Sequence, residues 1–264
     1  MRDRSQTVIR SRDNLRFKSL HRLATSARER RKAGLTLLDG MHLIAAYRAS
    51  GGVPEQLVLS ESGAGNAEAR RLAAGECAQG VLLLADPLFN DVAQVVTPTG
   101  IVAMIRTPKH GPLPATLENC VMLDAIQDAG NLGSILRSTA AAGISSVLLS
   151  QGCAYPWSPK VLRAGMGAHF SLSIFDDVDL AAAVSRLKGK LICASSHARK
   201  SLYQIDLHGP LAWVFGNEGS GVSAALCDAA AEQVCIPMPG KTESLNVAAA
   251  AAICLFEQVR QRRV

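Results

Sequence analysis

Short apolar runs separated by polar or glycine-containing turns recur along most of this chain of 264 residues. In its first half, residues 34–51 predict a strand that runs into a helix. Three further apolar runs predict short strands at 56–60, 80–85 and 100–106, with a helix at 68–79 between the first two. Together these elements predict a small α/β unit.

A proline-rich stretch separates this unit from the rest of the chain. Residues 107–114 hold three prolines and one glycine, a composition that favours a linker over a helix or a strand. We therefore predict a basic arm over 1–32, a domain over 33–106, a linker over 107–116 and a second domain over 117–264.

Strands and helices alternate regularly after the linker. The pattern predicts strands at 121–126, 145–150, 170–175, 191–196, 211–216 and 233–238, and helices at 131–143, 158–168, 178–189, 223–231 and 244–263. Apolar runs bounded by turn residues and followed by helices are typical of a mostly parallel sheet covered on both faces. The predicted fold class is α/β.

The charge of the chain is unevenly distributed. Its formal net charge is +6, but residues 1–32 hold eleven Arg and Lys against three Asp and Glu, a net of 11 − 3 = +8. The remainder carries 17 − 19 = −2. Clustered arginine and lysine usually neutralise phosphates, so the arm predicts contact with a polyanion; a solubilising tail is the alternative.

Cysteine usage and the N-terminal sequence bear on location. Seven cysteines occur without a C-x-x-C pair, which favours buried thiols in a reducing cytoplasm and predicts no metal site. The N-terminus lacks the apolar core of a secretory signal, and no apolar run is long enough to span a bilayer. An arginine-rich transit peptide is the alternative to a cytoplasmic chain.

Three polar segments follow predicted strands, where ligands bind in open α/β sheets. In the first, Asn131 and Gly133 open a helix, and Arg137 lies one turn after Gly133 on the same face. Such a helix start can cradle a phosphate. The alternative is that Asn131 is a helix cap and Arg137 an ordinary surface residue.

The other two segments surround glycines. Residues 213–223 hold three glycines together with Asn217 and Glu218, without the spacing of a dinucleotide or P-loop fingerprint. Residues 236–252 run from a strand through a polar loop into an alanine-rich helix that begins near Ser244 or Leu245. For residues 213–223 the alternative is a tight strand-to-helix turn that binds no ligand. For residues 236–252 the alternative is that the alanines only reflect high helix propensity.

In order and spacing the three segments resemble the motifs of the SpoU/TrmH branch of the SPOUT methyltransferases. The matching residues are Asn131, Gly133 and Arg137 in the first motif, Gly216, Asn217 and Glu218 in the second, and Ile236, Met238, Gly240, Ser244, Leu245 and Asn246 in the third. The resemblance covers residues 120–260, and the upstream region resembles the substrate-binding domain of many members. Ala129 and Ala248 depart from the pattern, where proline and serine are common.

The resemblance implies a deep C-terminal trefoil knot that binds S-adenosylmethionine. Carried over by position, Gly216, Ile236 and Leu245 would cradle the cofactor largely through backbone groups. Beside them would lie Asn217, Met238 and Asn246.

The resemblance also implies methyl transfer to a ribose 2′-hydroxyl of RNA by a homodimer with its site at the subunit interface. Arg137 would be the catalytic arginine, and the groups that orient it and the ribose would be Asn131, Glu218, Ser244 and Asn246. The alanine-rich final helix would form part of the interface. The separate N-terminal domain favours ribosomal RNA over transfer RNA.

Two other readings compete with this one. A Rossmann-type methyltransferase would carry its glycine-rich turn after the first strand, whereas here that turn comes near the end of the chain. A catalytically inactive RNA-binding protein would also suit the basic arm. The presence of Arg137, Glu218 and Asn246 argues for retained chemistry.

Overall fold

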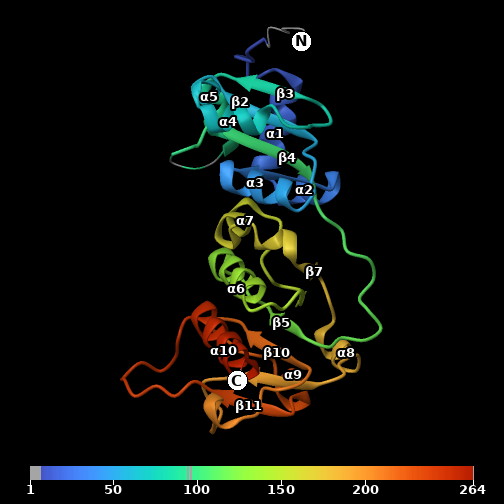
Figure 1. Ribbon diagram of the computed structural model, residues 1–264, viewed down its shortest axis with the longest axis vertical. Coiled ribbons are helices and arrows are strands. Elements are labelled where there is room, and N and C mark those ends of the chain that lie inside the picture. Colours follow the sequence, from blue (N-terminus) through green and yellow to red (C-terminus); the bar gives the residue numbers. More distant parts are fainter. Residues whose placement is uncertain (1–6, 94, 96, 264) are drawn as a thin grey trace. The chain divides into compact units, whose positions relative to one another are not determined.

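The computed structural model describes residues 7–93, 95 and 97–263 (Figure 1). Residues 1–6 of the predicted basic arm and residue 264 of the predicted second domain lie outside the described residues. The chain divides into two compact units. The N-terminal unit runs to Lys109 and includes Trp157–Arg163, and the C-terminal unit holds His110–Pro156 and the residues from Ala164 onward.

The N-terminal unit is built around a mixed sheet with the strand order β1-β4-β2-β3. The strands are β1 (Leu35–Asp39), β2 (Gln56–Ser60), β3 (Val81–Leu84) and β4 (Ile101–Arg106). β4 is antiparallel to both of its neighbours, while β2 and β3 are parallel. The helices are α1 (Leu15–Thr25), α2 (Ala27–Ala33), α3 (Met41–Ala49), α4 (Ala67–Ala73) and α5 (Asp86–Ala93), with a 3₁₀ turn at Gly63–Gly65. The four predicted strands and helix α3 are confirmed, and the helix predicted at 68–79 is present as α4 but ends at Ala73.

Helices α1, α2 and α5 were not predicted from the sequence. The side chain of Asn14 caps α1 by accepting hydrogen bonds from the amides of Arg16 and Phe17. The apolar side chains of α1 join the buried core of the unit, which also holds those of α5; from α1 these are Phe17, Leu20, Leu23 and Ala24. The second half of the arginine-rich segment 1–32 is therefore part of a packed core.

Some of the positive charge of this segment is used inside the fold. The guanidinium of Arg30 is buried and donates to the carbonyls of Leu23 (2.6 Å) and Ala24 (3.0 Å) near the end of α1. These acceptors are carbonyls that a helix leaves without an internal partner. Arg12 forms an ion pair with Asp91 at 2.7 Å. The net charge of the arm therefore overstates what is available to a ligand.

The C-terminal unit contains a seven-stranded sheet in which every strand pair is parallel, with the order β7-β6-β5-β10-β8-β11-β9. Its strands are β5 (Cys120–Asp124), β6 (Ser146–Leu149), β7 (Ser173–Phe175), β8 (Lys190–Ala194), β9 (Lys200–Ser201), β10 (Leu211–Gly216) and β11 (Glu232–Cys235). The predicted parallel α/β sheet is confirmed, and only the two-residue strand β9 was missed.

Helices and 3₁₀ turns connect these strands. They are α6 (Ala129–Ala141), α8 (Leu180–Val184) and α9 (Ala224–Ala229), with turns at Ala168–Ser171 and Leu202–Gln204, whereas α10 (Val247–Arg262) follows the last strand. Helix α7 (Pro159–Gly165) crosses the boundary between the units, and the Thr36 hydroxyl donates to the Trp157 carbonyl within the N-terminal unit (2.7 Å). The predicted strand at 170–175 is shorter than expected, because its first residues form a 3₁₀ turn.

The parallel sheet is buried on both faces. Alternate residues of β5, β8 and β10 pack with Leu180 of α8 and Leu226 of α9 in one apolar cluster. On β10, Trp213 donates its indole N–H to the Gln258 side chain of α10 (2.7 Å). Figure 1 shows α10 lying beside α6. Burial on both faces explains why the sequence of these strands is continuously apolar rather than alternating.

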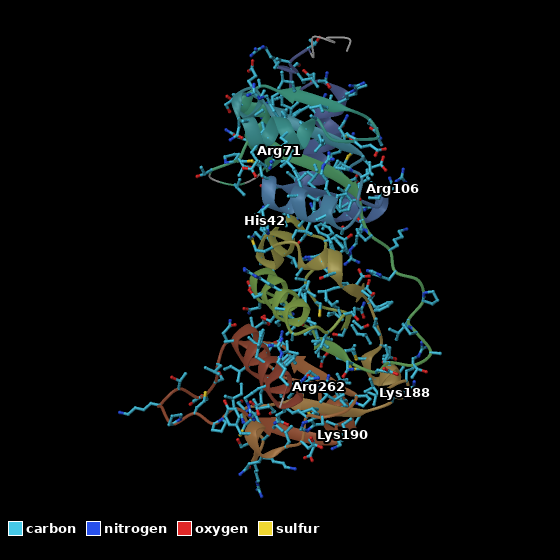
Figure 2. The ribbon with its side chains drawn as sticks, viewed as in Figure 1. His42, Arg71, Arg106, Lys188, Lys190 and Arg262 are labelled. Atoms are coloured by element: carbon cyan, nitrogen blue, oxygen red, sulfur yellow. The ribbon has the colours of Figure 1, made fainter. Side chains whose placement is uncertain are left out.

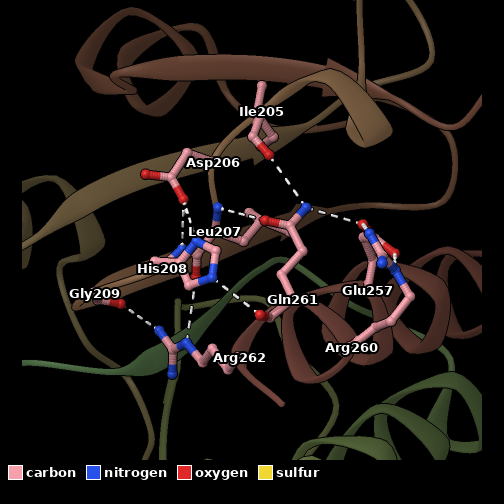
Figure 3. A network of polar contacts seen from close by, with 9 residues as sticks. All are labelled: Ile205, Asp206, Leu207, His208, Gly209, Glu257, Arg260, Gln261 and Arg262. Atoms are coloured by element: carbon pink, nitrogen blue, oxygen red, sulfur yellow. Dashed lines mark hydrogen bonds and ion pairs between the residues drawn. The ribbon is translucent and has the colours of Figure 1, made fainter. Parts of the chain in front are cut away.

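The C-terminal end of α10 is tied to the loop before β10 (Figure 3). The Gln261 side chain accepts from the Leu207 amide (3.0 Å) and donates to the Ile205 carbonyl (3.2 Å). Arg262 donates to the carbonyls of Leu207 and Gly209. These contacts fix the helix at the end remote from its first residue.

The trefoil knot implied by the resemblance stays a prediction. Within the part of the chain that the structure describes, no helix has both the length and the apolar character needed to cross a membrane.

Candidate functional site

The turns that carry the first and second motifs meet at one edge of the parallel sheet. β5 and β10 are neighbours, and their last residues, Asp124 and Gly216, lie opposite each other in the register. Because the two strands are parallel, the segments that follow them both leave the sheet at its carboxyl edge. Two segments separated by about ninety residues in sequence are therefore brought together by strand pairing.

The second motif forms a closed, glycine-rich turn after β10. The amide of Asn217 donates to the Gly221 carbonyl and the amide of Gly221 donates back to the Asn217 carbonyl. The Asn217 side chain accepts from the amides of Gly219 (2.9 Å) and Ser220 (3.1 Å), and it donates to the Ala125 carbonyl (2.9 Å). The side chain of Asn217, a residue predicted to bind the cofactor, thus makes its hydrogen bonds within and beside the turn.

Gly216 is required by the turn itself. A Cβ atom at this position would lie 2.1 Å from the Gly221 carbonyl carbon and 2.2 Å from the Val222 nitrogen. Backbone atoms cannot move aside as a flexible side chain can. The lack of a Cβ at 216 is therefore required by the chain's own backbone, whether or not a ligand is bound.

A cavity of about 1030 Å³ opens beside this turn. Of the predicted site residues, those that line it are Gly216, Asn217, Glu218, Ile236, Met238, Ser244, Leu245 and Asn246. Asn131 and Arg137 do not. The volume lies at the upper end of the range of cavities that hold small ligands, which is roughly 300–1,000 Å³.

The sequence reading missed one wall of this cavity. Ser195, Ser196 and His197, which follow β8, also line it. Their signal was present, because the predicted strand at 191–196 ends in polar residues next to β10 in the sheet. The spacing of the three motifs did not draw attention to this strand end.

Three of the predicted site residues form a chain of hydrogen bonds. The Nδ2 group of Asn246 donates to Oδ1 of Asn131 (2.8 Å), and Nδ2 of Asn131 donates to Oε1 of Glu218 (2.9 Å). Oδ1 of Asn246 accepts from the amides of Ala248 and Ala249 and so caps α10. The helix cap fixes which way the Asn246 amide points, and this sets the direction of every bond in the chain.

Glu218 accepts the last bond of the chain as a carboxylate. Partial burial raises the pKa of Glu218, but hydrogen bonds from Asn131 and from the amides of Glu218, Asp128 and Gln127 outweigh it and hold that pKa below its usual value. Asp128, which the sequence reading overlooked, caps α6 by accepting from the Asn131 amide (2.7 Å). The backbone amide and the side chain of Asn131 are therefore both held by hydrogen bonds.

Arg137 lies apart from the cavity. It is exposed on α6, and within the described part of the chain its side chain makes no hydrogen bond or ion pair. Ser244 and Leu245 lie in the segment 239–246, which is exposed throughout and extends away from the sheet before α10 (Figure 1). The chain therefore brings the cavity and the Asn–Asn–Glu chain together, but it does not bring the Arg137 side chain to the cavity.

Comparison with solved structures defines the class of protein first. A crystal structure of an RNA 2′-O ribose methyltransferase superimposes with a TM-score of 0.83 at 30% identity, covering 98% of this chain and 100% of that one. The SpoU methyltransferase AviRb from Streptomyces viridochromogenes, in complex with AdoMet, gives a TM-score of 0.79 at 25% identity over 95% of this chain and 99% of that one. The fold is that of an RNA methyltransferase.

Sequence comparison then identifies the family. Residues 118–256 match the SpoU rRNA Methylase family, and residues 14–103 match the MRM3-like substrate binding domain. The Bacillus subtilis 23S rRNA (guanosine(2553)-2′-O)-methyltransferase RlmP is 32% identical over 94% of this chain and 97% of its own length. Human mitochondrial rRNA methyltransferase 3 is 30% identical over 94% of this chain and 73% of its own length. The chain belongs to the SpoU rRNA methylase family.

The cavity fits the S-adenosylmethionine on which this family depends. Its walls combine apolar side chains, such as Ile236 and Leu245, with the backbone groups of the glycine-rich turn. Glu218 and Glu243 add two carboxylates. The apolar walls would complement the flat aromatic ring of such a ligand, and the two carboxylates would complement its positive charge.

Proposed function

We propose that this chain transfers a methyl group from S-adenosylmethionine to a ribose 2′-hydroxyl of ribosomal RNA. The observation that carries the proposal is the Asn246–Asn131–Glu218 chain of hydrogen bonds, whose two end residues, Asn246 and Glu218, line the glycine-rich cavity. It gives a fixed set of polar groups next to a cavity suited to the cofactor. The three family motifs supply all of these residues.

The cofactor supplies a methyl group already activated on a sulfonium. The protein therefore has to align the hydroxyl oxygen and stabilise the charge that develops on it. Arg137 carries a guanidinium that stays protonated, so it is suited to holding a phosphate and an alkoxide rather than to acting as a base. Phosphate or solvent then takes the proton. Ser244 and the Asn–Asn–Glu chain orient the ribose.

We propose that the active protein is a homodimer in which Arg137 of one copy serves the cavity of the other. The exposure of Arg137 away from its own cavity supports this, as do the extended segment 239–246 and the exposed Phe256 of α10. A mixture of Arg137→Ala and Glu218→Ala subunits tests it. If the arginine acts across the interface, exchange restores about a quarter of normal activity; if it acts within one subunit, the mixture stays inactive.

Ribosomal RNA is the proposed substrate, in preference to transfer RNA. The match of residues 14–103 to a substrate-binding domain and the names of the relatives support this choice. Exposed cations on the N-terminal unit offer phosphate contacts: within the described part of the chain, Arg16, Arg28, Lys32 and Arg71 form no ion pair (Arg71 is labelled in Figure 2). The seven free cysteines support a reducing, cytoplasmic location.

Transfer of a labelled methyl group from S-adenosylmethionine to separate pools of unmodified ribosomal and transfer RNA tests the proposal. We expect label in ribosomal RNA, resistant to alkaline cleavage at the modified nucleotide because the 2′-hydroxyl is blocked. Label on a base, or in transfer RNA alone, would contradict the proposed reaction or the proposed substrate respectively.

A further inference from the structure

Asp124 stands out among the acidic residues near the cavity because one carboxylate joins three segments of the chain. It is the last residue of β5. Its Oδ2 accepts from the Ser223 amide (2.9 Å), and its Oδ1 accepts from the Ser150 hydroxyl (3.1 Å). Ser150 follows β6, and Ser223 is the residue before α9. The carboxylate therefore links two neighbouring strand ends to the start of a helix.

The bond to Ser223 holds the far end of the glycine-rich turn. At its near end the turn is fixed by the pairing of Gly216 with Asp124 in the sheet. Residues 217–222 between these two points line the cavity, whereas Asp124 does not. One residue thus holds both ends of the loop that forms a cavity wall, without reaching the cavity itself.

The bond between Asp124 and Ser150 supports the same turn indirectly, through Ala125. The Ser150 hydroxyl also accepts from the amide of Ala125 (2.8 Å), whose φ of 54° lies in the left-handed region that L-residues rarely adopt. The carbonyl of Ala125 accepts from the Asn217 side chain, which builds the turn. Asp124 and Ser150 therefore fix the strained residue that orients Asn217.

We propose that Asp124 is a positioning residue for the cofactor: it holds the glycine-rich turn in the shape that binds S-adenosylmethionine. This rests on the proposed function of the cavity. Because its role is to accept hydrogen bonds, an asparagine should replace it well. The Asn oxygen can accept from the Ser223 amide, and the Asn amide can donate to the Ser150 oxygen.

Titration calorimetry with S-adenosylhomocysteine, the reaction product, tests the proposal without RNA. We expect Asp124→Ala to raise the Kd at least about tenfold and Asp124→Asn to stay within about threefold, as expected for loss and retention of the two hydrogen bonds that hold the turn. Asp179→Ala is the matched control. Asp179 and Asp124 both line a second, separate cavity that does not include residues 217–222. The Asp179 carboxylate, however, caps α8 through the Ala182 amide and makes no bond to the turn.

Kinetics separate positioning from a general structural role. For Asp124→Ala we expect the KM for S-adenosylmethionine to rise while kcat changes little, because a displaced turn weakens binding. A reduced number of binding sites with unchanged Kd would mean partial unfolding and would overturn the proposal. So would a Kd equal to that of the unmodified chain.

Hydrogen exchange gives a test that does not depend on the cofactor. Without any ligand, Asp124→Ala should lose protection at the amides of 217–223, and Asp179→Ala should not. Unchanged protection would overturn the placement of Asp124. If the unmodified chain failed to bind the cofactor, the proposed function would fail, while this exchange experiment would still decide whether Asp124 holds the turn.

Discussion

The side-chain amide of Asn246 donates a 2.8 Å hydrogen bond to Oδ1 of Asn131, although 115 positions separate the two residues in the sequence. Asn246 is at the same time the cap of α10. The last helix of the chain therefore begins on the residue that orients the first motif. Capping of the last helix and orientation of Asn131 therefore depend on the same side chain.

Asn246→Asp should separate capping from orientation. Aspartate caps helices as well as asparagine does, but it has no N–H to give to Asn131. We expect methyl transfer to fall by about 10²-fold, as for loss of an oriented catalytic group, while the thermal midpoint stays near that of the unmodified chain. Asn246→Ala, which also removes the cap, should lower stability by about 1 kcal/mol in addition. Full activity of Asn246→Asp would show that the hydrogen-bond chain has no role in the reaction.

Arg137→Ala should slow turnover strongly without affecting cofactor binding. Arg137 is proposed to hold an RNA phosphate and the developing alkoxide rather than the cofactor, so the Kd for S-adenosylmethionine should not change, while kcat falls by about 10²–10³-fold. Single-turnover assays and calorimetry measure the two effects separately. Arg137→Lys serves as the control, because it keeps the charge but not the planar, forked donor geometry. Its rate should lie between the rates of the unmodified chain and of Arg137→Ala. Weakened cofactor binding in Arg137→Ala would contradict the assignment of Arg137 to the RNA rather than to the cofactor.

Gly216→Ala should disrupt the glycine-rich turn. Its methyl group would lie 2.1 Å from the backbone of Gly221, so we expect a loss of about 1–3 kcal/mol in unfolding free energy and loss of cofactor binding. Gly219→Ala places the same group in the same turn, 3.5 Å from Oδ1 of Asn217, at an ordinary contact distance. Its urea midpoint should match that of the unmodified chain. Equal midpoints for both variants would contradict this account of Gly216.

The sequence was sufficient for the parallel sheet but not for helices α1, α2 and α5 of the N-terminal unit. Strands such as β10 are buried on both faces and leave a continuous apolar run, LAWVFG, that no surface element would carry. In α1 the buried positions Phe17, Leu20 and Leu23 are spaced among basic residues, and the charge of the segment concealed their helical period.

The candidate site was predictable as a set of residues but not as an arrangement. Motif spacing identified Asn131, Glu218 and Asn246, yet it could not show which amide donates to which acceptor. Asp124 was missed because its role depends on bonds to Ser150 and Ser223, which are distant in sequence. Strand pairing, which sequence spacing does not encode, brings these residues together.

The stability of the C-terminal unit should fall below neutral pH because of His169. Burial lowers the pKa of His169 to about 4, although the bond to the Pro156 carbonyl opposes this. The unfolded chain has an ordinary histidine pKa near 6.5. Between the two pKa values it therefore binds a proton that the folded chain does not bind. Stability is therefore lost as pH falls from about 6.5 toward 4, by about 2 kcal/mol at pH 5.

Urea unfolding of the unmodified chain and of His169→Gln at pH 7.5 and pH 5.0 measures this contribution. Glutamine can keep the bond to the Pro156 carbonyl but does not titrate. We expect the variant to lose about 2 kcal/mol less than the unmodified chain between the two pH values. Equal losses would mean that His169 takes up its proton in the folded state as readily as in the unfolded one.

The central claim is tested most directly by mapping ribose methylation across the ribosomal RNA of cells that lack this gene and of cells that carry it. The account predicts that one 2′-O-methylated nucleotide disappears on deletion, returns with the unmodified gene and does not return with the Arg137→Ala gene. An unchanged ribosomal RNA methylation map, or restoration by the Arg137→Ala gene, would contradict it.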